Sequence, residues 1–374
     1  MHAGIYIHIP YCDTKCIYCD FYSLTDIRNK TQFISSLKKE IISVSEKLRN
    51  KSFDTIYFGG GTPSLLEYDD FAGIFEVIYK YHNIADNPEI TIEINPGTIN
   101  KSKLQRFKKL PINRLSFGVQ SFIDSELEYL TRIHSAKIAE DSVKLAQDEG
   151  YTNINIDLIF AIPGQSLENW KYNLNKAYKL LPQHISAYSL IFEESTPLHR
   201  ALNAGRTYKT DAELESDMYD YTADYLKKNG YKHYEISNFA KAGYLCRHNL
   251  KYWSLEEYIG YGPSASSYIN SRRWTNIRNL KKYIEYIENN LSVIDFSEET
   301  DENRTKLEYI MLKLRSTGID YDEFEKKFGS SFQSLYSEPI KTLIENNFAA
   351  EHDNKFFLNS RGYSLCDEIT TKYF

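Results

Sequence analysis

The feature that most constrains the fold is a regular alternation of short strand-like runs with longer amphipathic stretches over about the first 195 residues. Short runs rich in Ile, Phe and Val predict six strands, at 5–9, 55–58, 90–95, 114–120, 153–160 and 184–192. Apolar residues at three- and four-residue spacing predict helices between them, at 30–49, 68–81, 136–149 and 167–181. Strands joined by helical crossovers are typical of β/α units around a mostly parallel sheet.

The predicted strands also alternate between an apolar and a polar face. The polar positions include Glu93, Gln120 and Asp157, each of which follows or precedes an apolar residue along its strand. A parallel sheet covered by helices on both faces would be apolar on both. We therefore predict an α/β barrel or open barrel, with helices outside and a polar lumen that holds a ligand. The alternative, an antiparallel sheet with one solvated face, is disfavoured by the long helical crossovers.

The pattern changes after residue 195 and predicts a division into three parts. Residues 1–195 form the barrel, and 196–299 form an extension of it, with a helix at 212–229 and a loop-rich segment at 230–276. Residues 300–374 show three helical patterns, a hairpin at 348–357 about Asp353-Asn354 and a final helix, as in a small winged-helix-like domain. The chain has 45 Lys+Arg and 51 Asp+Glu, which gives a net charge of −6, so no nucleic acid partner is expected.

Three cysteines mark a metal site directly after the first predicted strand. Cys12, Cys16 and Cys19 have C-x3-C-x2-C spacing, and three soft thiolates favour iron–sulfur, zinc or Cu(I). The loop offers no fourth Cys or His for a structural zinc. In a cluster normally held by four cysteines, three leave one iron open to a small molecule. The five cysteines are an odd and clustered number, and no apolar run is membrane-sized, so we expect a cytoplasmic chain.

With Tyr18 before the last cysteine, this spacing resembles the radical S-adenosylmethionine (SAM) superfamily, whose [4Fe-4S] cluster binds SAM at its unique iron. Gly59-Gly60-Gly61-Thr62-Pro63 resembles the superfamily's glycine motif, although a tight turn alone would also explain the glycines. The resemblance implies a partial (β/α)6 barrel of the TIM type. It implies that the SAM site is lined by Tyr6, Tyr18, Gly60, Gly61, Thr62 and Glu93. It places Gln120, Arg132 and Asp157 where one branch of the superfamily holds a second SAM; for Gln120 and Arg132 an interior hydrogen bond without a ligand is an equal alternative.

Within the superfamily, the chain resembles the HemN-like coproporphyrinogen dehydrogenase group, and most closely its HemW branch of haem chaperones. The matching segments are Tyr-Ile-His-Ile-Pro-Tyr-Cys at 6–12, Phe-Gly-Gly-Gly-Thr-Pro at 58–63, Glu-Ile-Asn-Pro at 93–96, Phe-Gly-Val-Gln-Ser-Phe at 117–122 and Asp-Leu-Ile-Phe-Ala-Ile-Pro-Gly-Gln at 157–165. The dehydrogenases continue as C-x3-C-x2-C-x-C, where this chain has Phe21. Residues 246–253 match the HemW pattern C-x-H-N-x-x-Y-W, in which His248 is the candidate haem ligand and Cys246 a second candidate. A structural role is the alternative for both.

These features imply a haem chaperone that carries a SAM-ligated [4Fe-4S] cluster and transfers haem to acceptor proteins, such as respiratory enzymes. One alternative is an enzyme, an oxygen-independent coproporphyrinogen III dehydrogenase that cleaves SAM with electrons from a low-potential donor such as flavodoxin. Another is a zinc-stabilised barrel with an interaction domain. Because the first two remain open at this point, no catalytic residue is assigned. A homodimer and a peripheral contact with the membrane are further expectations.

Overall fold

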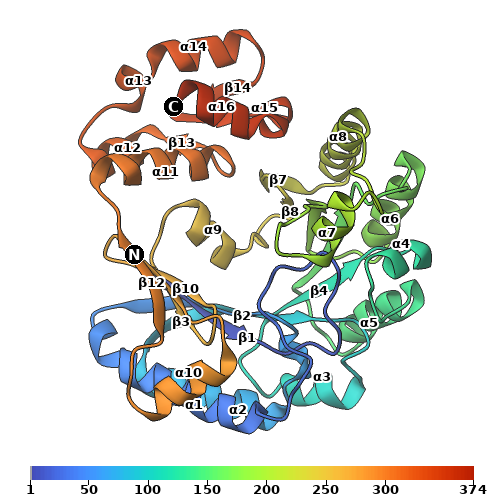
Figure 1. Cartoon of the computed structure of the whole chain (residues 1–374). Helices are drawn as coiled ribbons and strands as arrows, with labels where there is room; N and C mark the ends of the chain where they lie inside the picture. Colours follow the sequence, from blue (N-terminus) through green and yellow to red (C-terminus); the bar gives the residue numbers. More distant parts are fainter. Residues whose placement is uncertain (1) are drawn as a thin grey trace.

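A twelve-stranded sheet forms the centre of the molecule in the computed structural model, which describes residues 2–374 (Figure 1). Its order is β12-β11-β10-β9-β1-β2-β3-β4-β5-β6-β8-β7, and β1 to β6 are parallel neighbours. The parallel strands are β1 (Ala3–Ile9), β2 (Ser52–Gly60), β3 (Asn83–Ile94), β4 (Arg114–Gln120), β5 (Ile154–Phe160) and β6 (His184–Ser189). These are the six predicted strands, and the predicted partial (β/α)6 barrel is confirmed.

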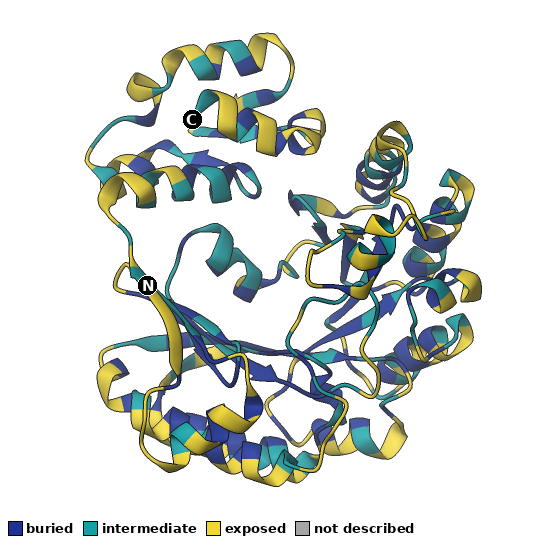
Figure 2. Cartoon of the chain, viewed as in Figure 1, coloured by how far each residue is buried: buried dark blue, intermediate teal, exposed yellow. Residues whose placement is uncertain are grey.

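Helices cover the outer, apolar face of the six strands. They are α1 (Lys30–Ser45), α2 (Tyr68–Tyr81), α3 (Lys101–Phe107), α5 (Ala136–Asp148) and α6 (Leu167–Lys179). Short helices lie in the connections: η1 (Glu46–Leu48), η2 (Pro63–Leu65), α4 (Asp124–Tyr129) and α7 (Pro197–Asn203). Ile5, Ile7 and Ile9 of β1 are completely buried on this side. Figure 2 shows exposed residues on the outer sides of the helices and mainly buried residues along the strands. The apolar half of each alternating strand therefore forms the core, and the polar half faces inward.

Local sequence signals fix where the outer helices begin. The Ser135 hydroxyl accepts the Ile138 N–H and caps α5, and Ser166 caps α6 in the same way through Asn169 N–H. At α2 the side chain of Asp70 accepts the Glu67 N–H at 2.9 Å, as part of a capping box. These caps satisfy N–H groups that the first helical turn leaves without partners, so the helices start at the predicted positions.

The segment after α7 extends the sheet at both edges. Beside β6 lie β8 (Asn238–Ala240) and β7 (Lys232–Glu235), and beside β1 lie β9 (Tyr258–Tyr261), β10 (Ser266–Ile269), β11 (Arg272–Asn276) and β12 (Ile294–Glu299). The helices are α8 (Ala212–Lys228), α9 (Arg247–Trp253) and α10 (Leu280–Glu288). The expectation of a loop-rich segment at 230–276 was wrong, because short strands that pair at a sheet edge carry too few residues to show a period. The domain boundaries at 195 and 299 stay a prediction.

The last part of the chain (Figure 1) packs around a second, smaller core, to which Leu255 and Tyr268 of the extension also contribute. Its helices are α11 (Glu302–Leu314), α12 (Tyr321–Phe328), α13 (Phe332–Leu335), α14 (Ser337–Glu345), α15 (Ser360–Ser364) and α16 (Cys366–Tyr373). Strands β13 (Ile319–Asp320), β14 (Ala349–His352) and β15 (Lys355–Leu358) form a sheet in the order β13-β15-β14. The predicted hairpin is present, and Asp353 and Asn354 have φ values of 50° and 61°, as its two-residue turn requires. Within residues 2–374 we find no helix long and apolar enough to cross a bilayer.

Candidate functional site

A cavity of about 570 Å³ opens at the carboxyl ends of the parallel strands. Its walls come from the loop after β1 and from the ends of β2 to β6, because loops at this edge of a parallel sheet converge on one point. Of the residues predicted for the cluster and for SAM, the cavity is lined by Cys12, Cys16, Cys19, Tyr18, Gly60, Gly61, Thr62, Glu93, Gln120, Arg132 and Asp157. Tyr6 is the exception, and it lines a smaller neighbouring cavity instead.

The three thiols are half-buried, and all of them line this cavity. The Thr62 hydroxyl lies 3.4 Å from Cys12 Sγ, and the Arg132 guanidinium lies 3.5 Å from Cys16 Sγ. Burial raises the pKa of the Cys19 thiol to about 11, so a soft metal must displace the proton when it binds. Across residues 2–374, no three His, Cys, Asp or Glu side chains are gathered closely enough to hold a single metal ion. Three thiols that line one cavity supply the soft ligands that an iron–sulfur cluster requires.

The glycine motif packs directly against the cysteine loop. A Cβ added to Gly61 would lie 2.5 Å from the Tyr11 carbonyl oxygen, and Gly60 has a φ of 104° with no room for a side chain beside the His8 ring. The Gly61 N–H donates to the Ile9 carbonyl at 2.8 Å, and the Thr62 N–H donates to the Tyr11 carbonyl at 2.6 Å. Glycine is therefore needed here for close approach of two backbones, which fixes the thiols relative to β2.

The polar side of the lumen carries two half-buried carboxyl groups, Glu93 and Asp157. Burial, helped by the nearby Asp157, raises the pKa of Glu93 to about 7, although the Tyr57 hydroxyl donates to Glu93 Oε1 at 2.9 Å. Burial also raises the pKa of Asp157, which accepts hydrogen bonds from Ser116 at 3.2 Å and from Asn155 at 2.7 Å. Two carboxyls in one lumen favour a ligand with hydroxyl or ammonium donors.

Arg132 joins the polar wall to the cysteine loop. Besides Cys16 Sγ, its guanidinium donates to the Gly118 carbonyl at 2.7 Å and to Asn95 Oδ1. The neighbouring Gln120 lines the same cavity with a left-handed φ of 69°. Sequence reasoning missed Tyr57 and Asn95 as site residues. Both occupy polar positions on or beside predicted strands, which is the signal that would have identified them.

His248 lies apart from the thiols, on helix α9 and not on a loop as predicted. Its ring is 1% exposed, with Nδ1 2.8 Å from Thr55 Oγ1 and Nε2 2.8 Å from the Tyr252 hydroxyl. Burial lowers the pKa of His248 to about 3, so the imidazole is neutral. Both ring nitrogens are engaged, and neither is free for iron in this conformation. Burial also raises the pKa of the neighbouring Cys246 to about 12, which leaves an unreactive thiol.

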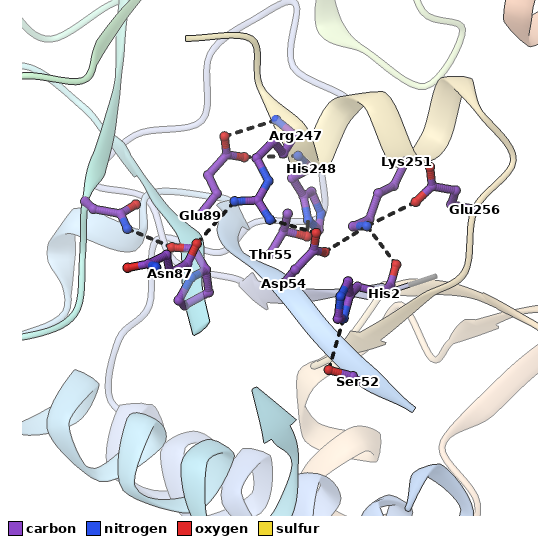
Figure 3. Close-up of polar contacts among 12 residues, drawn as sticks. His2, Ser52, Asp54, Thr55, Asn87, Glu89, Arg247, His248, Lys251 and Glu256 are labelled. Carbon is purple, nitrogen blue, oxygen red and sulfur yellow. Dashed lines mark hydrogen bonds and ion pairs between the residues drawn. The ribbon is translucent and has the colours of Figure 1, made fainter. Parts of the chain in front are cut away.

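Helix α9 is held by a polar network on the first half of β2 and the middle of β3 (Figure 3). Glu89 of β3 accepts the Arg247 and His248 N–H groups, each at 3.0 Å, in place of a helix cap from α9 itself. Asp54 of β2 pairs with Arg247 at 2.7 Å and with Lys251 at 2.8 Å. The first turn of α9 therefore packs on β2 and β3, whereas the thiols line the cavity at the carboxyl ends of the strands.

Comparison with known proteins agrees with this geometry. Residues 6–177 match the Radical SAM superfamily, and residues 306–365 match the HemN C-terminal domain. The chain is 34% identical over 367 residues to the heme chaperone HemW of Bacillus subtilis (strain 168), with 97% of each chain covered. It is 34% identical over 372 residues to the heme chaperone HemW of Lactococcus lactis subsp. lactis (strain IL1403), with 98% of this chain and 96% of the relative covered.

The solved structure of coproporphyrinogen III oxidase (HemN) from Escherichia coli shares the fold, with a TM-score of 0.84 over 99% of this chain and 89% of that one. At 20% sequence identity, this likeness concerns the fold alone. The relationship to the HemW proteins is closer and extends over the whole chain. The chain therefore belongs to the HemW family of heme chaperones, within the radical SAM superfamily.

Proposed function

We propose that this chain binds haem and transfers it to acceptor proteins, and that it carries a [4Fe-4S] cluster and SAM in the barrel lumen. The observation that carries the proposal is full-length similarity to HemW proteins combined with three thiols and a glycine motif around one cavity. The cavity volume of about 570 Å³ lies within the range of cofactor sites. The position of Phe21, in place of a fourth cysteine, favours the chaperone over porphyrinogen oxidation.

In this proposal Cys12, Cys16 and Cys19 hold the cluster, which supplies one iron with an open position for SAM. The SAM site is formed by Tyr18, Gly60, Gly61, Thr62, Glu93, Gln120, Arg132 and Asp157, which line the main cavity. The Arg132 guanidinium offsets the negative charge of the ligated thiolates, and the Thr62 hydroxyl donates toward Cys12 Sγ. The Tyr57 hydroxyl orients the Glu93 carboxyl into the lumen.

His248 and Cys246 remain the haem ligands that the sequence pattern proposes, and the structure adds a condition to that role. To bind iron, His248 must give up its hydrogen bond to Thr55 or to Tyr252. Cys246 is completely buried. Ligation by either residue therefore requires α9 to leave its present position.

The proposal has finer parts that concern partners. Acceptor proteins would meet the chain at the opening of the main cavity, where Phe21, Ile133 and Ile191 are 63%, 53% and 65% exposed. Respiratory enzymes are the proposed acceptors, reached through a peripheral contact with the membrane. A low-potential donor such as flavodoxin would reduce the cluster, and the chain would act as a homodimer in the cytoplasm, where its five free thiols stay reduced.

Anaerobic reconstitution with iron and sulfide, followed by haem titration, tests the proposal. We expect one cluster and stoichiometric haem, and transfer of haem to an apo-acceptor. Cys16→Ala should abolish the cluster without abolishing haem binding, and Cys366→Ala, which removes a thiol from the C-terminal core, should change neither. With SAM, dithionite and coproporphyrinogen III, formation of protoporphyrinogen would contradict the chaperone role and favour the enzyme.

A further inference from the structure

A second cavity, of about 280 Å³, lies beside the cysteine loop. It adjoins the lumen, and its walls come from β1, the end of the cysteine loop, α9, the β9–β10 hairpin and the segment between β11 and α10. The wall residues that matter here are Tyr6, Phe21, Tyr252, Tyr258, Ser266 and Arg278. Asp20 and Phe21 line both cavities, so the two meet directly after Cys19.

Aromatic rings dominate the walls of this second cavity. Tyr252 and Tyr258 contact each other edge to face, with ring centroids 4.6 Å apart. Phe21 is 63% exposed, which is unusual for a large apolar ring at the edge of a cavity. Rings arranged around a narrow space bind flat, apolar ligands through face and edge contacts.

Arg278 adds a positive charge at the rim. Its side chain is 49% exposed and donates to the Asp20 carboxylate at 3.2 Å and to the Asp20 carbonyl oxygen. A guanidinium has five N–H donors, so these contacts leave others for a second carboxylate. Flat apolar rings with a carboxylate-binding group at the rim match a tetrapyrrole whose propionates point outward.

We infer that this cavity binds one edge of the haem macrocycle, with a propionate on Arg278; the inference rests on the proposed function. A volume of about 280 Å³ is slightly below that of cavities that enclose whole small molecules. The opposite edge of the macrocycle therefore stays outside, against the exposed Phe21 ring. A chaperone needs such an accessible edge, because the acceptor must contact haem before the donor releases it.

This placement does not use His248 as a ligand. The ring of Tyr252 lines the second cavity, while its hydroxyl lies 2.8 Å from Nε2 of His248 on the other side. Tyr252 thus separates the imidazole from the ligand. In this placement, binding depends on ring contacts and on the ion pair between a propionate and Arg278. Metal-free protoporphyrin IX should therefore bind about as well as haem.

Titration of the full-length chain with haem and with metal-free protoporphyrin IX tests the inference. Ser266→Phe fills the second cavity from β10 and excludes the ligand, whereas Arg278→Ala removes a charged hydrogen bond at the rim. Each should weaken the binding of both ligands by about tenfold or more. Ile191→Trp, at the opening of the main cavity alone, is the matched control and should leave both affinities unchanged.

Three results would overturn the inference. They are unchanged affinities in Arg278→Ala and Ser266→Phe, a loss confined to Ile191→Trp, or failure of the metal-free porphyrin to bind. If Ser266→Phe does not fold, the affinities of Arg278→Ala decide the question, because the Arg278 side chain is half-exposed and does not pack in the core. Failure of the unsubstituted chain to bind haem at all is a different result, which overturns the proposed function itself.

Discussion

Replacement of Glu89 by alanine should release helix α9 from the barrel without unfolding the chain. The Glu89 carboxylate is buried on β3 and accepts both the Arg247 and the His248 N–H groups at 3.0 Å. Residue Cys246 at the cap position of α9 makes no side-chain cap bond. Glu89 is therefore the group that satisfies the first turn of this helix.

The size of the effect follows from these two contacts. Hydrogen bonds to a charged group contribute about 1.5–3 kcal/mol each, and an orphaned buried N–H adds a desolvation penalty. Arg247 is exposed, so water can replace its partner, whereas the His248 N–H is buried. We expect a net loss of about 3 kcal/mol in the docking of α9, which corresponds to about a hundredfold increase in its local opening.

Native-state hydrogen exchange followed by mass spectrometry measures this opening directly. Amides of 247–253 should exchange about a hundredfold faster in Glu89→Ala, while those of β5 in the barrel core keep their protection. Asp86→Ala removes an exposed carboxylate from the same strand and is the matched control. Unchanged exchange in α9, or an equal increase in Asp86→Ala, would refute the reasoning.

The same variant separates two accounts of haem binding. If His248 ligates the iron, a freed α9 makes the ligand more available, and haem binds more tightly. If haem occupies the second cavity, release of α9 removes Tyr252 from its wall, and haem binds more weakly. The two accounts therefore predict opposite signs for one measurement.

Three further variants test other contacts. Lys251→Ala breaks a buried ion pair with Asp54 and should lower the free energy of unfolding in urea by about 3–5 kcal/mol; a change below about 1 kcal/mol would contradict this. Gly61→Ala places a Cβ against the Tyr11 carbonyl and should lower the iron content after reconstitution while far-UV circular dichroism stays native; full iron content would contradict it. Burial raises the pKa of Glu40 to about 7, so its contribution to stability is complete below the unfolded pKa and is lost as the pH rises through 7. Glu40→Gln should therefore gain about 3 kcal/mol relative to the unsubstituted chain between about pH 5 and pH 8, and parallel pH profiles would contradict this.

The parts of the structure that depend on local pattern were predictable from the sequence. Two-residue alternation identified the six barrel strands and the polar lumen, and the spacing of Cys12, Cys16 and Cys19 placed the thiols on one loop. The Asp353-Asn354 turn followed from residues that tolerate a left-handed backbone. In each case the physical cause lies within a few residues along the chain.

The parts that depend on distant partners were not predictable. Helix α9 forms where a loop was expected, because the group that completes its first turn, Glu89, lies 158 residues away from Arg247 in the chain. The edge strands of the extension are equally dependent on strands already present, such as β1 for β9. Tyr6 was expected in the SAM site but lines the second cavity, and its neighbours along the chain do not distinguish the two positions.

Tyr57 connects helix α9 with the polar wall of the main cavity. Its hydroxyl donates to Glu93 in the main cavity, and its ring stacks on His248 of α9, with centroids 5.1 Å apart. Tyr6 stacks against both Tyr57 and His248 and also lines the second cavity. A shift of α9 must therefore move rings that contact the polar wall of the lumen, because close-packed side chains do not move independently. The C-x-H-N-x-x-Y-W segment thus supports side chains that contact the main cavity, in addition to any contact that it makes with haem.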